Sequence, residues 1–471
     1  MDFLHNTLPL DHFLALPRPD HGEVAVGTTD TSTLAAHDFD VDTRTGFMPP
    51  QPPLTRLPEQ WELWETALDD ALTSRLRLAE KDDLAEEDVA KSGRWRTRVS
   101  ESELLLRRAH HVLAWLMHLY IHSTPTAITE IHIPPPITLP LLQVSAQLQL
   151  PPVLTYSDDV LYNWAYKSPP SSDRPLAPPA LDNLRCLTLF TGTRDEEEFY
   201  LASARIEFRG VEALGLMRAI MDEAFLGDAT AVRRITAYLH ALARVTADLT
   251  AILAAVRDGC DPATFYHDIR PWFKGADSDP RRRWVFDGLE RDPALKQPLE
   301  LSGPSAGQSA LIHALDVFLG VDQYSHTNFL LDAPGTPASA SAAPAPVPPT
   351  ATATFSSAPG TRAVPFLTRM QSYMPRHHRA FLRHLGASPR PLRALVQASR
   401  DAALVGAYNA AVGALKVFRD EHVRIVALYI LGPSRRAGAP GAPAKGTGGT
   451  DAFKFVQGVR NQTAGALLRQ E

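Results

Sequence analysis

Apolar residues recur at helical spacing through most of the second half of the chain. The longest such run begins near Leu392 and ends at Leu431, with apolar positions three or four residues apart. Alternating apolar and polar residues, which would predict strands, are scarce. The same periodicity predicts further helices over 196–225, 230–257, 262–273, 308–319, 376–385 and 451–469. We therefore predict a mainly α protein with a large all-α bundle.

The beginning of the chain has a different pattern. Residues 1–55 are rich in Pro, Thr, Asp and Gly and show little periodicity, which predicts an extended arm. Two amphipathic helices are predicted over 58–81 and 101–121, and a short helix over 140–150 between proline stops. This part of the chain is predicted to form a smaller, loop-rich domain.

Composition shifts mark the predicted boundaries. A Pro/Ser/Ala connector over 169–179 separates a small N-terminal domain, residues 1–190, from the helical domain, residues 191–471. Within the second domain, residues 332–363 are rich in Pro, Ala, Ser and Thr and bury too little apolar surface to fold, so we expect a disordered insertion. The Gly/Pro-rich residues 432–450 are predicted to form a mobile lid.

Composition and charge exclude several classes of protein. An apolar content of 44% over 471 residues is enough for sizeable cores. The net charge is −6 and there is no long basic run, so we expect no nucleic-acid partner. The two cysteines, far apart in the sequence, form neither a disulfide framework nor a metal site. We find no signal peptide and no continuous run of about 20 apolar residues, and we expect a cytosolic protein without a membrane partner.

The long C-terminal run contains the first candidate for chemistry. His422 lies next to its apolar face, and Arg419 lies about one turn earlier. A neutral imidazole on a rigid helix suits haem iron as an axial ligand, and a nearby arginine can reach a haem propionate. A lone histidine beside an apolar stripe is more often an ordinary core or surface residue. The pattern alone leaves both interpretations open.

A second group of histidines lies in or beside the helix over 101–121. The spacing of His118 and His122 suits a metal ion. No carboxylate or cysteine is placed to complete such a site. We therefore favour a structural role for these histidines.

Two small-residue loops precede helices. The segment over 446–450 is glycine-rich but lacks the lysine and strand of a P-loop, so a lid explains it better than a phosphate site. The loop over 301–309 has small side chains that would let the backbone approach a flat ligand, although a plain capped helix start is the commoner meaning.

Taken together, the motifs resemble those of the indoleamine 2,3-dioxygenase family. The similarity runs from about Leu150 onward and is interrupted by the 332–363 insertion. The matching segments occur in the family's order and are residues 150–156, 199–203, 265–270, 305–309, 318–320, 373–375, 378–382, 419–422, 429–430 and 445–451.

The resemblance implies a haem b enzyme that inserts both atoms of O2 across the C2–C3 bond of L-tryptophan. The product is N-formylkynurenine, and the reaction opens the kynurenine route. His422 matches the proximal iron ligand and Arg419 a propionate contact, while Asp316 matches an aspartate that could tune the ligand by hydrogen bonding. Haem b, L-tryptophan and O2 are the implied partners, and we expect a monomer.

The resemblance also implies the substrate pocket. Phe265 matches the aromatic residue that packs on the indole, and Arg270 matches the arginine that binds the substrate carboxylate, as a bidentate guanidinium does well. Ser203 matches a pocket residue on the reacting side. The remaining substrate contacts implied by the resemblance are Tyr156, Phe199, Ser305, Ala306 and the lid residue Thr447.

Four residues depart from the family pattern. Asp159 stands where mammalian members have cysteine, and a buried carboxylate there needs a partner or a raised pKa. Pro304 replaces a glycine and removes a backbone donor, while Tyr266 and His267 make their segment more polar. The alternative function is therefore a haem-binding member with little dioxygenase activity, serving as a gas or redox binder or acting on another indole.

Overall fold

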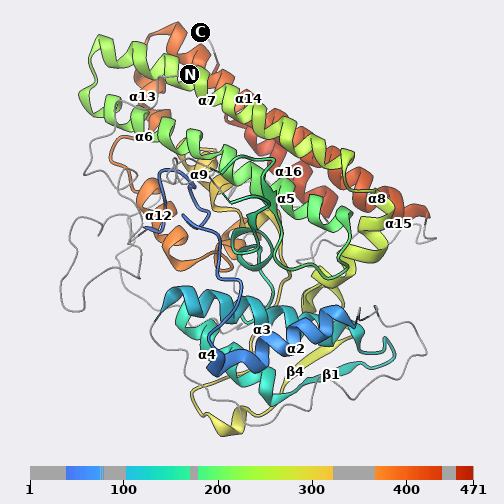
Figure 1. The fold of residues 1–471 in the computed structure, drawn as a ribbon. Helices are drawn as coiled ribbons and strands as arrows, with labels where there is room; N and C mark the ends of the chain where they lie inside the picture. Colours follow the sequence, from blue (N-terminus) through green and yellow to red (C-terminus); the bar gives the residue numbers. More distant parts are fainter. Residues whose placement is uncertain are drawn as a thin grey trace, which may run out of the picture.

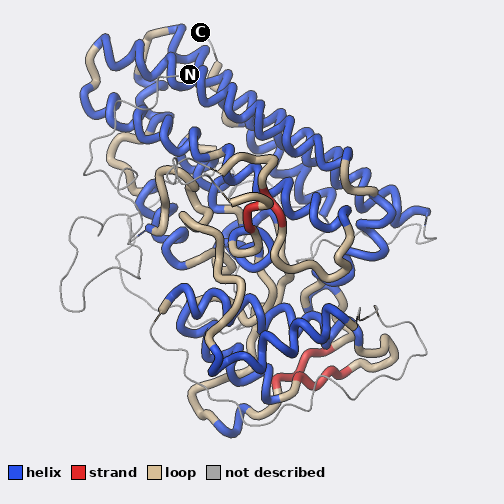
Figure 2. The backbone as a smooth tube through the Cα atoms, viewed as in Figure 1, coloured by secondary structure: helices blue, strands red, loops and turns tan. Residues whose placement is uncertain are grey.

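The computed structural model of the chain describes residues 39–74, 76, 78, 102–169, 179–321, 366–436 and 452–469. Helices dominate these residues, and the strands are few and short (Figure 2). A helical bundle lies above a layer of helices and one small sheet in the view of Figure 1. The predicted mainly α class is confirmed. The predicted insertion over 332–363 and most of the predicted lid lie outside the described residues.

The bundle is built on the contact between α7 (Ala229–Ala255) and α14 (Ala402–Val426), which run side by side (Figure 1). Both helices bury apolar residues at helical spacing, such as Leu239 and Leu242 of α7 and Tyr408 of α14. The other helices of this part are α5 (Arg194–Arg209), α6 (Val211–Leu226), α8 (Pro262–Thr264), α9 (Ala310–Phe318), α11 (Phe366–Gln371), α12 (Arg376–Gly386), α13 (Leu392–Ala398), α15 (Gly432–Arg436) and α16 (Ala452–Gly465).

Two of the predicted helices are divided in the structure. Gly210 separates α5 from α6, and a Cβ there would lie 2.2 Å from Leu311 Cδ2, so the glycine allows α9 to approach closely. The run predicted over 391–431 is interrupted before Asp401, whose carboxylate accepts a hydrogen bond of 2.8 Å from the Ala403 amide and caps α14.

Among the residues that the structure describes, one helix, with the turn that follows it, is long and apolar enough to cross a membrane by length and composition alone. This segment, Ala229–Asp258, was not expected from the search for a continuous apolar run. In the structure α7 packs against α6 and α14, and its exposed side carries charged residues such as Arg233 and Asp248. This arrangement is that of an amphipathic helix in a bundle.

The lower layer combines three helices with a two-stranded parallel sheet. A buried ion pair between Arg108 Nη2 and Glu65 Oε2, 2.6 Å apart, joins two of the helices. The predicted helix over 140–150 in fact begins at Pro135, because proline at a first helical position loses no hydrogen bond. The elements are α2 (Glu62–Thr73), α3 (Glu103–Ser123), α4 (Pro135–Leu148), β1 (Glu130–Ile133) and β4 (Arg283–Phe286).

The two layers exchange segments of the chain. Strand β4 comes from beyond residue 191, yet it pairs in parallel with β1, with Ile131 opposite Trp284. A second small sheet joins β2 (Ala165–Tyr166) and β3 (Leu184–Arg185). A separate loop-rich N-terminal domain is therefore not evident in the structure, and the boundary at residue 190 stays a prediction.

Candidate active site

Three short segments of the described chain form π-helical turns, Ser157–Leu161, Phe265–Ile269 and Ala427–Leu431. Such turns change the direction in which side chains leave a helix and are frequent at functional sites. Each of the three contributes residues to a single pocket. The pocket is therefore built where the backbone departs from regular helix.

This pocket encloses about 1050 Å³, part of it open to solvent. It gathers eight of the residues predicted from the sequence, which are Tyr156, Phe199, Ser203, Phe265, Arg270, Ser305, Ala306 and His422. The predicted lid residue Thr447 lies outside the described residues. Segments separated by up to 266 positions in the sequence thus meet at one cavity. The roles assigned to these residues stay predictions.

His422 connects this pocket to a second hollow of about 830 Å³. Burial and the nearby positive charge of Arg419 lower the pKa of His422 to about 4, so its imidazole is neutral at physiological pH. A neutral imidazole beside a mostly apolar pocket has the chemistry that would hold the iron of a haem group. Among the described residues there is no cluster of three His, Cys, Asp or Glu side chains that suits a metal ion held by protein alone.

Arg419 and Asp316 line the second hollow together with His422. The Arg419 guanidinium donates from Nη2 to both Asp316 oxygens, at 2.5 and 2.6 Å, and from Nη1 to Thr463 Oγ1. The Asp316 carboxylate thus pairs with Arg419, and its predicted role in tuning the iron ligand stays a prediction. Contact between Arg419 and a propionate stays a prediction.

Arg270 brings a positive charge to the wall of the pocket. Its side chain is 7% exposed, and the guanidinium carbon lies 5.6 Å from the centre of the Tyr266 ring. Burial lowers the pKa of Arg270 below its ordinary value. His267 is exposed, and neither His267 nor Tyr266 lines the pocket, so the more polar segment meets the site only through the contact of the Tyr266 ring with Arg270.

Aromatic rings form the apolar wall. The Phe199 and Phe265 rings lie 4.4 Å apart, and Phe265 meets the Tyr429 ring edge-on at 5.6 Å. The Tyr429 hydroxyl donates to the Cys260 carbonyl at 2.6 Å, which fixes that ring. Such a wall suits a flat aromatic ligand.

A buried carboxyl supports the floor of the pocket and was missed from the sequence. Glu207 Oε1 accepts hydrogen bonds from the Tyr156 hydroxyl at 3.0 Å and from Ser309 Oγ at 2.6 Å. Burial raises the pKa of Glu207 to about 7. The two hydrogen bonds lower the pKa, but their effect is smaller than that of burial. Glu207 lies one helical turn after Ser203 on α5, and this spacing is the sequence signal that could have found it.

Gln308 links the same floor to the 301–309 loop. Its side chain accepts from the Tyr156 amide at 2.8 Å and donates to the Gly303 carbonyl at 2.9 Å. The small-residue loop therefore holds the segment that carries Tyr156. Pro304, Ser305 and Ala306 form one edge of the pocket beside Phe366 and Phe455, whose rings lie 4.4 Å apart.

His118 and His122 take structural roles in the described chain. His118 Nδ1 lies 2.8 Å from the Trp272 carbonyl, and His118 Nε2 accepts from the Leu154 amide at 3.3 Å. His122 Nε2 lies 3.0 Å from the Lys274 carbonyl. Their ring nitrogens thus tie α3 to the segments on either side of the pocket.

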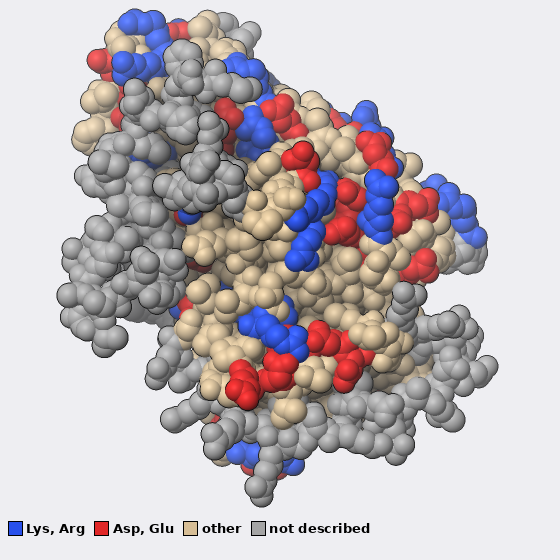
Figure 3. Space-filling model, viewed as in Figure 1, with Lys and Arg blue, Asp and Glu red and all other residues tan. Residues whose placement is uncertain are grey.

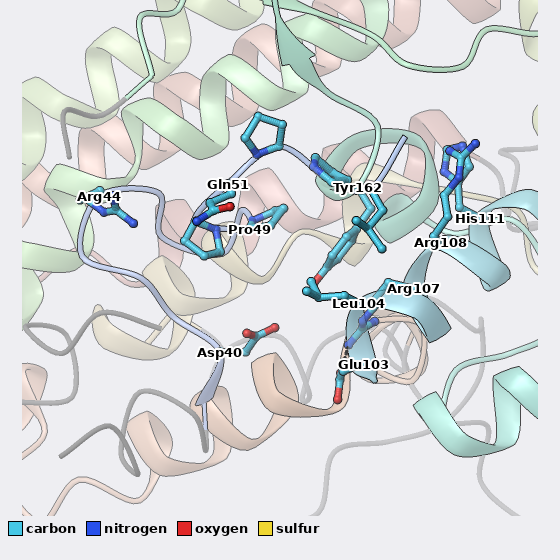
Figure 4. A pocket seen from close by; sticks show the side chains of 14 residues that line it. Asp40, Arg44, Pro49, Gln51, Glu103, Leu104, Arg107, Arg108, His111 and Tyr162 are labelled. Atoms are coloured by element: carbon cyan, nitrogen blue, oxygen red, sulfur yellow. Dashed lines mark hydrogen bonds and ion pairs between the residues drawn. The ribbon is translucent and has the colours of Figure 1, made fainter. Parts of the chain in front are cut away.

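A separate, charged hollow lies between α3 and the 39–54 segment (Figure 4). Its charges are largely paired, with Arg107 on Glu103 at 2.8 Å and Arg44 on Asp42 at 3.4 Å. On the molecular face shown in Figure 3, Lys and Arg alternate with Asp and Glu over the described residues. The pocket at His422 is therefore the stronger candidate for an active site.

Comparisons with known proteins agree with this geometry. The family model described as Indoleamine 2,3-dioxygenase matches residues 35–466. Rat indoleamine 2,3-dioxygenase 1 is 29% identical, covering 94% of this chain and 98% of its own length. The 6-hydroxytryptophan 2,3-dioxygenase of Fusarium equiseti is 29% identical, covering 93% and 99%. Indoleamine 2,3-dioxygenase of Saccharomyces cerevisiae is 32% identical, covering 70% and 65%. The chain therefore belongs to the indoleamine 2,3-dioxygenase family.

Proposed function

We propose that this chain is a haem-dependent dioxygenase that cleaves the C2–C3 bond of the L-tryptophan indole with O2. The product is N-formylkynurenine, the first compound of the kynurenine route. The family is one of dioxygenases, which supports the reaction class. The observation that carries the proposal is that one pocket combines the neutral imidazole of His422 with the Arg270 guanidinium and the Phe199 and Phe265 rings.

Each of these residues has a task in the proposed reaction. His422 holds the iron of haem b, which supplies the chemistry of dioxygen activation when bound. Arg270 binds the substrate carboxylate as a bidentate partner, and the two phenylalanines hold the indole plane. The apolar wall excludes water, and Ser203 lies at the junction of the two hollows, where it can orient the indole N–H.

An indole other than L-tryptophan is the second candidate substrate. Asp159 and Pro304 both line the pocket and depart from the mammalian pattern. One fungal relative is named for 6-hydroxytryptophan, so members of the family differ in their substrates. A haem-binding member with little dioxygenase activity is the other alternative. A cytosolic location and a monomeric state belong to this proposal, and the two free, buried cysteines support a reducing compartment.

Isotope labelling tests the reaction class. Purified ferrous protein is supplied with L-tryptophan under 18O2, and the product is analysed by mass spectrometry. A dioxygenase yields N-formylkynurenine with two 18O atoms. A single labelled atom, or a haem protein that releases no product, would rule out the proposed chemistry.

A further inference from the structure

Two neighbouring buried aspartates, Asp158 and Asp159, differ in their hydrogen bonding, and only Asp159 lines the pocket. Asp158 Oδ1 lies 2.7 Å from His110 Nδ1, and Asp158 Oδ2 accepts from the Thr155 amide at 2.9 Å and the Thr155 hydroxyl at 2.7 Å. In the next residue, Asp159, the carboxyl oxygen Oδ1 has no hydrogen-bond partner. The segment thus pairs both oxygens of one buried carboxyl and leaves one oxygen of the next carboxyl without a partner.

Asp159 is 5% exposed and lines the pocket, and its Oδ1 has no hydrogen-bond partner. A buried polar atom without a partner destabilises the folded state, so such an atom calls for an explanation, and a ligand that supplies the partner is one. Burial, and then the charge of Asp158, raise the pKa of Asp159 well above its usual range. The raised pKa favours the protonated form of this side chain, and a protonated carboxyl can donate a hydrogen bond as well as accept one.

The location of Asp159 determines which part of an indole it can meet. Tyr156, Ser203 and His422 line both hollows, whereas Asp159 lines only the pocket that contains Arg270. The bond to be cleaved must face the His422 side, and N1 of an indole is bonded to C2. The N–H therefore faces the side that holds Ser203. The six-membered ring lies on the other side of the indole from the C2–C3 bond, and Asp159 belongs to the lining of the pocket that would receive this ring.

We propose that Asp159 is a specificity-determining residue that hydrogen-bonds a hydroxyl group on the six-membered ring of the indole. The preferred substrates are then ring-hydroxylated tryptophans. This inference rests on the proposed dioxygenase function and specifies its substrate class. A hydroxyl supplies the partner that the carboxyl lacks, while L-tryptophan leaves the carboxyl unsatisfied or bound to water.

The test measures substrate preference in the haem-loaded protein. Dissociation constants are measured from the change in the Soret band, and kcat/KM from oxygen consumption. The substrates are L-tryptophan, its N1-methyl analogue and tryptophans hydroxylated at each six-membered-ring position in turn. At least one hydroxylated isomer should bind about tenfold more tightly than L-tryptophan, because one hydrogen bond of about 1.4 kcal/mol corresponds to that ratio. Equal or weaker binding of every hydroxylated isomer overturns the proposal.

Two variants, one isosteric and one apolar, assign the preference to this side chain. Asp159→Asn keeps a hydrogen-bonding group and should keep most of the preference. Asp159→Leu removes that group and should lower the ratio of the affinity for the hydroxylated tryptophan to that for L-tryptophan about tenfold. An unchanged ratio in a folded, haem-loaded Asp159→Leu protein contradicts the role. A substitution that instead changes only the ratio of L-tryptophan to its N1-methyl analogue assigns Asp159 to the indole N–H and also overturns the proposal.

The outcomes distinguish this inference from the proposed function. Turnover of L-tryptophan without any preference dependent on Asp159 rejects the inference and leaves the dioxygenase intact. Tight binding of hydroxylated tryptophans, seen in the Soret band but without any product, rejects the dioxygenase function. The role of Asp159 in recognising the hydroxyl group is then retained.

Discussion

The Arg419 guanidinium and the Asp316 carboxylate form a buried ion pair behind His422, with Nη2 2.5 Å from Oδ1 and 2.6 Å from Oδ2. The two side chains are 6% and 8% exposed. The pair joins α9 to α14 and so fixes the helix from which His422 projects. Removing either partner leaves a buried charge that the apolar surroundings cannot compensate.

Loss of one partner of this pair should therefore destabilise the protein and weaken haem retention. Arg419→Met should lower the free energy of unfolding by about 3–5 kcal/mol, measured by urea denaturation of the haem-free protein. The double variant Arg419→Met with Asp316→Leu should recover much of that loss, because neither charge remains. Equal stability of the wild type and Arg419→Met would show that the ion pair is unimportant.

His422 should be indispensable for haem binding. His422→Ala is predicted to remain folded and to purify without a Soret band, because the only protein ligand in the proposal is gone. His313 provides a matched control, since it also lines the second hollow but uses Nε2 on the Gly307 carbonyl, 2.9 Å away. His313→Ala should keep the Soret band, and a full Soret band in His422→Ala would mean that another residue binds the iron.

Arg270 should control affinity for the amino acid rather than for haem. Arg270→Ala removes a charge-assisted, bidentate partner and should weaken L-tryptophan binding about 10- to 100-fold with the Soret band retained. Arg270→Lys keeps the charge but loses the planar, bidentate geometry of the guanidinium. Its affinity for L-tryptophan should therefore lie between those of the wild type and Arg270→Ala. Binding is measured by substrate titration of the Soret band. Unchanged turnover of Arg270→Ala at low substrate concentration would remove this residue from the proposed pocket.

Glu207 should make stability depend on pH. Its pKa is raised from 4.5 to about 7 in the folded protein, so the native state binds more protons than the unfolded state between these values. The contribution of Glu207 to the free energy of unfolding is therefore fully present below pH 4.5. It is lost as the pH rises through 7, and the total loss is about 3 kcal/mol. The difference between wild type and Glu207→Gln in urea denaturation at several pH values isolates this effect. A difference that does not vary with pH would contradict it.

Much of the site follows from local patterns in the sequence. The period of apolar residues identifies α14 and places His422 and Arg419 on it, and the motif order places Phe265, Arg270 and Ser305 in the same pocket. Two helix boundaries were missed although the sequence carries their signals, because Asp401 is a preferred helix cap and Pro135 a preferred first helical residue.

Other features depend on contacts between distant segments. The partner of Asp316 is Arg419, 103 positions away, and no local pattern specifies that pair. The pairing of β1 with β4 and the hydrogen bonds of Glu207 are likewise tertiary. The π-helical turns replace ordinary helix without a distinct composition, so periodicity predicted plain helix over Phe265–Ile269.

The most direct test of the central claim is to mix purified, ferrous protein with L-tryptophan in air and record the absorption spectrum over time. The account predicts a Soret band from the start and growth of the ultraviolet absorption of N-formylkynurenine, which is lost together with the Soret band in His422→Ala. A Soret band in the wild type with no product from L-tryptophan or any ring-hydroxylated tryptophan would contradict the account.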